Sequence, residues 1–115
     1  MIIVPTNKHI RFSKDAVAKE LGVPPMFVDK LVGKLLKDID HDIRELEHAI
    51  DSKDAEKIAS LAHRIKGASA NLRLKYLADL FLEIELPAKS GVFEGFDNLI
   101  DACKKEVEHI RGVMG

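Results

Sequence analysis

Apolar residues early in the chain recur at alternating intervals of three and four, which is the pattern of a helix with one buried face. The stripe consists of Val28, Val32, Leu35, Ile39, Ile43, Leu46 and Ile50. Pro24 and Pro25 suit the first turn of such a helix, because the missing N–H of proline costs no hydrogen bond there. The pattern predicts one long amphipathic helix that ends near Asp51 and Ser52.

A shorter helix is expected ahead of the long one, over residues 14–21. Ser13 can cap its first turn by accepting a backbone hydrogen bond, and Gly22 can adopt the left-handed conformation that stops a helix. Residues 1–11 show no comparable pattern, so we expect an irregular N-terminal segment there.

Three more helices follow from the same spacing. Asp51 or Ser52 is expected to cap the next one, which runs to about Leu72. A further helix begins near Leu74, and Pro87 with Ser90 and Gly91 marks its bend or end. The apolar stripes of the three are Ile58, Leu61, Ile65, Ala68 and Leu72; then Leu77, Phe81 and Ile84; then Phe96, Leu99, Ile100, Cys103, Val107 and Ile110.

The chain is predicted to be all-α, because no window shows the period-two alternation of a strand. Short connections between long helices favour antiparallel neighbours, so the last four helices should form an up-down four-helix bundle. The short first helix would lie across one end of it. At 115 residues, the length suits a single domain over residues 1–115.

Composition and charge narrow the function classes. Lys and Arg number 18 against 19 Asp and Glu, so no overall field favours nucleic acid or an anionic membrane. Cys103 is the only cysteine, which excludes an intramolecular disulfide and fits a reducing compartment. The apolar run over residues 1–4 is too short for a signal peptide or a membrane span. We therefore expect a cytoplasmic protein.

His63 is the residue that packing does not explain. A helix advances about 100° per residue, so His63 points away from the apolar stripe of its own helix. Ala59, Gly67 and Ala70 share its outer face and are too small to cover an imidazole, while Lys66 lies within about one turn. An exposed imidazole beside a cation indicates a chemical role.

Residues 63–72 read HRIKGASANL, and this segment resembles the phosphorylation motif of histidine-containing phosphotransfer (HPt) domains. The resemblance implies a helical bundle in which His63 is phosphorylated at Nε2 and relays phosphate between receiver domains or from a hybrid histidine kinase. It also implies that Ser69 forms a hydrogen bond between helices. The chain departs from the family at Arg73, where a glycine is common.

The chemistry can also be argued from the residues. A solvated imidazole has a pKa of about 6.5, so His63 keeps one nucleophilic nitrogen near neutral pH. Lys66 can stabilise the charge on the transferring phosphoryl oxygens. Glycine inside a helix costs about 1 kcal/mol relative to alanine, and Gly67 would repay that cost by admitting the partner. The partner should dock over this face, including Ala59 and Ala70.

The sequence holds no nucleotide-binding loop, so we expect a phosphocarrier without kinase activity rather than an enzyme. It also lacks the acidic cluster with which a receiver domain holds Mg²⁺, so we expect no cofactor on this chain and Mg²⁺ only on its partner. We further expect a monomer that binds neither nucleic acid nor membrane.

Two alternatives stay open. The chain could be an HPt-like adaptor that binds a receiver domain without phosphotransfer. It could also be a metal-binding bundle, since Glu45 with His48 and Glu106 with His109 have Glu-x-x-His spacing. Helical phase argues against metal, because His48 and His109 point away from the apolar stripes, and we predict no metal site.

Overall fold

The computed structural model describes residues 12–114, and within that range the chain forms five helices and no strand. These are α1 (Lys14–Leu21), α2 (Pro25–Asp51), α3 (Ala55–Asn71), α4 (Lys75–Lys89) and α5 (Phe96–Met114). The all-α prediction is confirmed for this part of the chain. The irregular segment expected over residues 1–11 lies outside the described residues.

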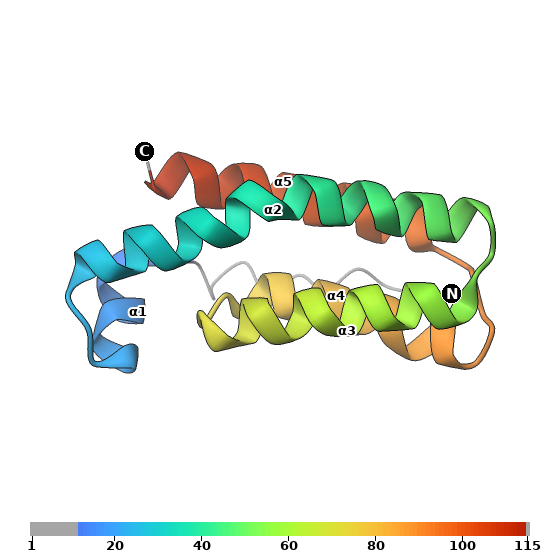
Figure 1. Cartoon of the computed structure of the whole chain (residues 1–115), viewed down its shortest axis with the longest axis horizontal. Helices are drawn as coiled ribbons and strands as arrows, with labels where there is room; N and C mark the ends of the chain where they lie inside the picture. Colours follow the sequence, from blue (N-terminus) through green and yellow to red (C-terminus); the bar gives the residue numbers. More distant parts are fainter. Residues whose placement is uncertain (1–11, 115) are drawn as a thin grey trace.

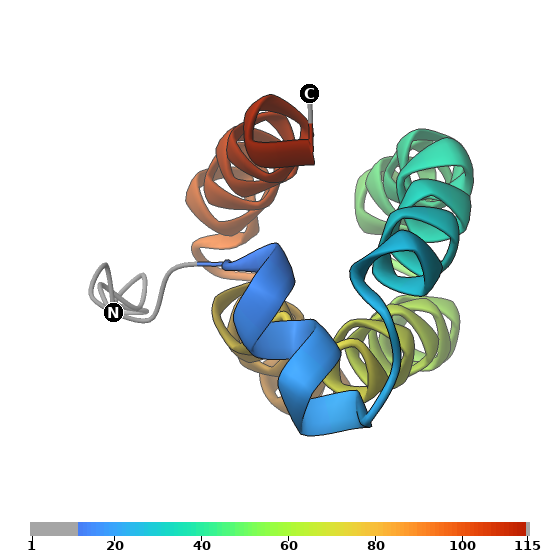
Figure 2. The same cartoon turned by 90° about the vertical axis from the view of Figure 1, so that its left-hand side faces the viewer.

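The four long helices lie side by side along the longest axis of the molecule (Figure 1). Helices α3 and α4 pack against each other most extensively, α2 lies on α3, and α5 lies on α4. Seen end-on, α2 and α5 stand apart at the top of the molecule, while α1 crosses the end of the bundle and contacts α2 (Figure 2). The molecule therefore has a closely packed α3–α4 side and a more open α2–α5 side.

Most of the predicted stripes are buried, with two shifts of register. In α2, Leu36 is buried in place of the predicted Leu35, and Ala49 in place of Ile50, while Leu35 and Ile50 are only partly buried. In α3 the predicted Ala68 is exposed. Because α3 packs chiefly on α4, its buried face is rotated toward that helix.

The helix ends are set by local hydrogen bonds. Ser13 caps α1 and Gly22 ends it at φ 69°, as predicted. The cap of α3 is Asp54, which accepts from the N–H of Lys57 at 3.1 Å, so the expectation of Asp51 or Ser52 was wrong. The Ser52 hydroxyl instead donates to the last carbonyls of α2. Its side chain therefore closes α2 and is not free to begin α3.

Helix α4 continues through Pro87 and ends at Lys89, with Ser90 as its C-cap and Gly91 beyond it at φ 73°. The helix thus ends next to Ser90 and Gly91, as predicted, and Pro87 lies within its last turn. None of the helices in the described range is long and apolar enough to cross a membrane.

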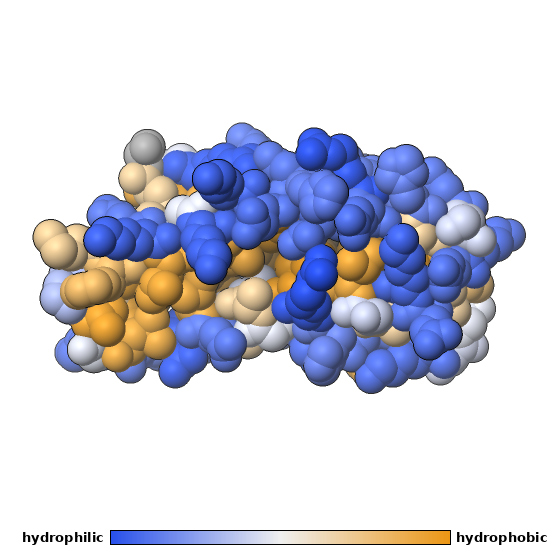
Figure 3. Space-filling view, in the orientation of Figure 1, coloured by the Kyte–Doolittle hydropathy of each residue, from blue (hydrophilic) through white to orange (hydrophobic). Residues whose placement is uncertain are grey.

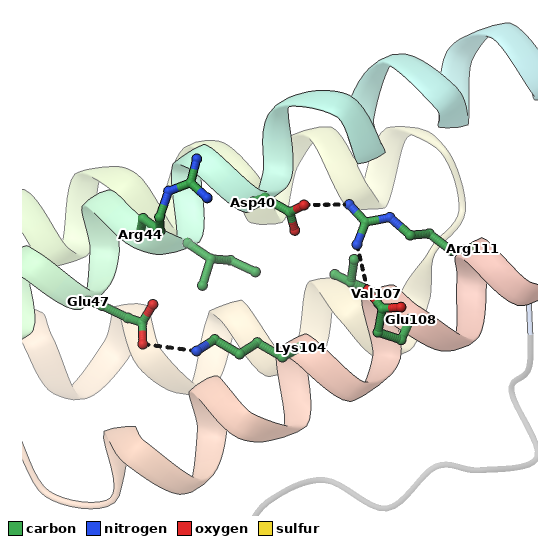
Figure 4. Close-up of a pocket in the computed structure, with 8 residues that line it drawn as sticks. Asp40, Arg44, Glu47, Lys104, Val107, Glu108 and Arg111 are labelled. Atoms are coloured by element: carbon green, nitrogen blue, oxygen red, sulfur yellow. Dashed lines mark hydrogen bonds and ion pairs between the residues drawn. The ribbon is translucent and has the colours of Figure 1, made fainter.

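Two surface features lie away from the α3–α4 side. Apolar side chains gather over the beginning of α2 and along the groove between α2 and α3 (Figure 3), and they include the exposed Met26, Phe27 and Leu31. Between α2 and α5, two ion pairs span a shallow pocket of about 320 Å³ (Figure 4). They join Arg111 to Asp40 at 2.8 Å and Lys104 to Glu47 at 3.0 Å.

Candidate functional site

His63 lies on the outer face of α3, and its side chain is 66% exposed. Its Nδ1 is 2.9 Å from Oε2 of Glu85 on α4. An ionised carboxylate only accepts hydrogen bonds, so Nδ1 must carry the proton in this contact. The neutral ring then keeps its lone pair on Nε2. The contact thus selects the tautomer in which Nε2 carries the free lone pair.

Glu85 is the centre of a cluster of charges between α3 and α4. The residue is only 1% exposed, yet three nitrogen atoms reach its carboxylate. Lys66 Nζ lies 3.0 Å from Oε1 and Lys89 Nζ lies 3.0 Å from Oε2, the same oxygen that His63 contacts. Oε1 has no hydrogen bond of good geometry, so Lys66 acts on it as an ion-pair partner.

These contacts decide the ionisation of Glu85. Burial acts to raise the pKa of the carboxyl, because the charged form loses its hydration. The ammonium groups of Lys66 and Lys89 and the ring N–H of His63 act in the opposite direction and outweigh burial, so the pKa falls from 4.5 to about 2. Glu85 is therefore an anion throughout the pH range in which proteins work.

Neighbouring helices bring this cluster together from distant parts of the sequence. Glu85 is flanked by Ile84 and lies one turn before Ala88 on the buried face of α4. A buried carboxylate without partners would cost several kcal/mol. The cations on α3 and in the last turn of α4 remove that cost, which is why an acidic residue can occupy a position in an otherwise apolar stripe.

Sequence reasoning did not find the roles of Glu85 and Lys89. From the sequence, Glu83 or Glu85 could only be considered as a further carboxylate for the metal-binding alternative, and Lys89 was assigned no role. One signal was present: Glu85 falls on the same helical face as Phe81, Ile84 and Ala88, where a charge requires a partner. The identity of that partner depends on how α3 and α4 pack.

The small residues predicted to surround His63 do lie on α3, where Ala59 and Gly67 are partly buried and Ala70 is exposed. A methyl group added at Gly67 would meet no atom within 4 Å among the neighbouring residues. Packing within the domain therefore does not require glycine at this position, and the open space beside His63 is available to another molecule.

Ser69 corrects one expectation. Its side chain is fully buried, but its hydroxyl donates to the carbonyl of Ile65, one turn earlier in the same helix, at 2.8 Å. The hydrogen bonds found in the described range include none from this hydroxyl to another helix. The carbonyl four residues earlier is the nearest acceptor for a serine on a helix. The buried hydroxyl of Ser69 is therefore satisfied within α3.

Arg73 adopts the left-handed conformation, at φ 61°, directly after the C-cap of α3. That is the conformation in which glycine usually ends a helix. The arginine side chain donates hydrogen bonds to the last carbonyls of the helix, from Nη1 to Ala70 at 3.3 Å and to Asn71 at 3.2 Å. The helix therefore ends in the ordinary way despite the missing glycine.

The Glu-x-x-His pairs do not assemble a metal site in the structure. Glu45 forms an ion pair with His41 at 2.9 Å, and His48 is exposed. Over residues 12–114, no three histidine, cysteine, aspartate or glutamate side chains lie close enough together to hold a metal ion. The geometry gives the metal-binding alternative no support.

Comparison with known proteins gives one significant result. No curated protein and no solved structure matches the chain significantly. The family model for the Hpt domain matches residues 30–112, which include His63, Lys66, Glu85 and Lys89. This match spans most of the chain, and the protein is therefore a member of the histidine-containing phosphotransfer (HPt) domain family.

Proposed function

We propose that this protein is a phosphorelay intermediate that accepts a phosphoryl group on His63 from a receiver-domain aspartate and passes it to another receiver. The observation that carries the proposal is the contact between His63 Nδ1 and the buried Glu85 carboxylate. It leaves the lone pair on Nε2, on a side chain that is mostly exposed. Membership of the HPt family supports the same reaction.

The transfer can be written with its charges balanced. The Nε2 lone pair attacks phosphorus, the P–N bond forms as the P–O bond breaks, and that bond's electrons stay on the aspartate oxygen. Because Nδ1 keeps its proton, the product is an imidazolium that carries the phosphoryl group. Glu85 faces that proton and stabilises the positive ring, while Lys66 stabilises the phosphoryl oxygens. No added base is needed.

The partner is inferred to approach over the outer face of α3. Ala59, Gly67 and Ala70 present little side chain there, so the loop that carries the acyl phosphate can reach His63. The donor and acceptor would be receiver domains of response regulators or of hybrid histidine kinases, and any Mg²⁺ would be held by them. Neither nucleic acid nor membrane is part of this proposal.

The proposal extends to the helix arrangement, the oligomeric state and the cellular location of the domain. We infer an antiparallel four-helix bundle with α1 across its end, acting as a cytoplasmic monomer. The chain would carry phosphate without making it from ATP. Residues 1–115 would form one HPt domain, of which residues 30–112 match the family model.

The test is transfer from a panel of ³²P-labelled receiver domains to the purified chain. Label that is acid-labile and base-stable marks phosphohistidine. His63→Gln should abolish labelling without unfolding the protein, because the side chain is exposed, and His48→Gln, at another exposed histidine, should label normally. Labelling of a folded His63→Gln variant would refute the assignment. Binding of a receiver domain without any labelling of the wild type would favour the adaptor.

A further inference from the structure

Neutralising the charge of Glu85 does not require Lys89. The Glu85 carboxylate carries one negative charge, and Lys66, the less exposed of the two lysines at 27%, already supplies one positive charge. Lys89 brings a second, although its side chain is 58% exposed and could remain in water. The cluster with a neutral His63 therefore holds one positive charge in excess, on the side of α3 where the imidazole lies.

That excess matches the charge that phosphorylation would bring. A phosphoryl dianion on Nε2, together with an imidazolium, adds one net negative charge to the cluster. With Lys66 and Lys89 both present, the phosphorylated cluster becomes neutral. Without Lys89, it would hold one uncompensated negative charge next to the buried Glu85 carboxylate.

We propose that Lys89 is a second phosphoryl-binding cation, which Glu85 holds beside His63 in the free protein and which turns to the phosphoryl oxygens when His63 is phosphorylated. This proposal deepens the phosphotransfer function above and rests on it. Lys89 Nζ and His63 Nδ1 contact the same oxygen, Oε2, at 3.0 and 2.9 Å, so the distance between the ammonium group and Nδ1 cannot exceed the sum of these two distances.

The position of Lys89 suits such a movement. Lys89 is the last residue of α4, and its long exposed side chain can exchange one ion-pair partner for another without disturbing the core. An exposed pair of glutamate and lysine at positions i and i+4 is ordinarily a weak surface feature. This pair differs because its glutamate is buried and already has an ion-pair partner in Lys66.

The experiment uses phosphoramidate, a small phosphodonor, so that the chemistry of the site is separated from partner docking. Lys89→Ala and Lys89→Arg are compared with the wild type and with Lys75→Ala, which removes an exposed lysine from the other end of the same helix. Two quantities are measured: the rate of phosphorylation, and the pH at which the ³¹P chemical shift of the phosphohistidine titrates. The second readout senses a cation at the phosphoryl oxygens and would not respond to a purely structural role.

Lys89→Ala is expected to slow phosphorylation by about three- to tenfold, a size appropriate to a half-exposed cation. It should also move the ³¹P titration to higher pH, because the dianion loses a positive neighbour. Lys89→Arg should restore most of both properties, and Lys75→Ala should resemble the wild type. Wild-type behaviour of Lys89→Ala, or equal defects in the Ala and Arg variants, would overturn the proposal for Lys89 alone. A wild type that no phosphodonor labels would instead overturn the phosphotransfer function, and this proposal with it.

Discussion

Replacing Glu85 with glutamine removes the charge of the cluster and keeps its shape. The amide oxygen can still accept from His63 Nδ1, but it no longer neutralises Lys66 or Lys89. Those lysines can turn toward water, whereas an imidazolium formed during transfer loses its anionic partner. We therefore expect a moderate loss of stability and a larger loss of phosphotransfer.

The structure sets the size and the pH dependence of the stability effect. A pKa lowered from 4.5 to about 2 corresponds to about 3 kcal/mol in favour of the ionised folded state. Partial solvation of the lysines weakens their attraction to the carboxylate and reduces this energy. Glu85→Gln should therefore lower the free energy of unfolding at pH 7 by about 2 kcal/mol. Because the folded pKa is depressed, this stabilisation is complete above pH 4.5 and is lost as the pH falls through about 2. The two proteins should therefore converge in stability in acid.

Urea unfolding followed by circular dichroism at several pH values between 7 and 2 measures both quantities. Glu94→Gln, at an exposed glutamate outside the helices, is the matched control and should change stability little. Transfer from a phosphorylated receiver domain should slow about tenfold, because a hydrogen bond to a charged acceptor is worth about 1–1.5 kcal/mol more than one to a neutral acceptor. A Glu85→Gln protein with wild-type stability at pH 7 and an unchanged pH profile would refute the electrostatic reasoning.

Two further predictions concern α3. Gly67→Ala should raise the free energy of unfolding, measured in urea, by about 0.5–1 kcal/mol, because the site is open and alanine favours a helix. Gly67→Leu should slow transfer from a receiver domain but not from phosphoramidate. Equal effects on both donors would contradict a role of Gly67 in partner access. Arg73→Gly should raise stability by about 0.5–1 kcal/mol, because glycine adopts φ 61° without strain and the lost contact with Glu20, at 3.4 Å, is solvent-exposed. A destabilised Arg73→Gly protein would show that the side-chain hydrogen bonds outweigh the strain.

Features that depend on neighbouring residues in the chain could be predicted from the sequence. The short first helix was predicted correctly at both ends, because Ser13 and Gly22 act on their own turns. The cap of α3 was misplaced because Asp51, Ser52 and Asp54 lie within four residues of one another and each has a side chain that can serve as a cap. In the structure, Lys53 adopts a left-handed backbone conformation at φ 55°, and the residue after it, Asp54, caps α3.

Features that depend on packing between helices could not be predicted in the same way. The exposed position of His63 follows from the period of its own helix, so it was predictable. Its contact with Glu85 spans 22 residues of sequence and depends on the register between α3 and α4. The same register decides that Ser69, rather than Ala68, is buried. The sequence could therefore indicate the nucleophile but not the carboxylate that orients it.

The ion pairs between α2 and α5 have a consequence for how the molecule opens. Arg111 holds α2 through Asp40 and the carbonyl of Leu36, and these contacts lie at the surface, where salt screens them. The α3–α4 side rests mainly on buried apolar contacts, and its cluster of charges is centred on the buried Glu85 carboxylate, so salt should screen it less. High ionic strength should therefore let α2 and α5 separate from each other while α3 and α4 stay packed. Amide hydrogen exchange should then be faster in α5 than in α3. His63 and Glu85 lie on α3 and α4, so the hydrogen bond between them should persist when α2 and α5 separate.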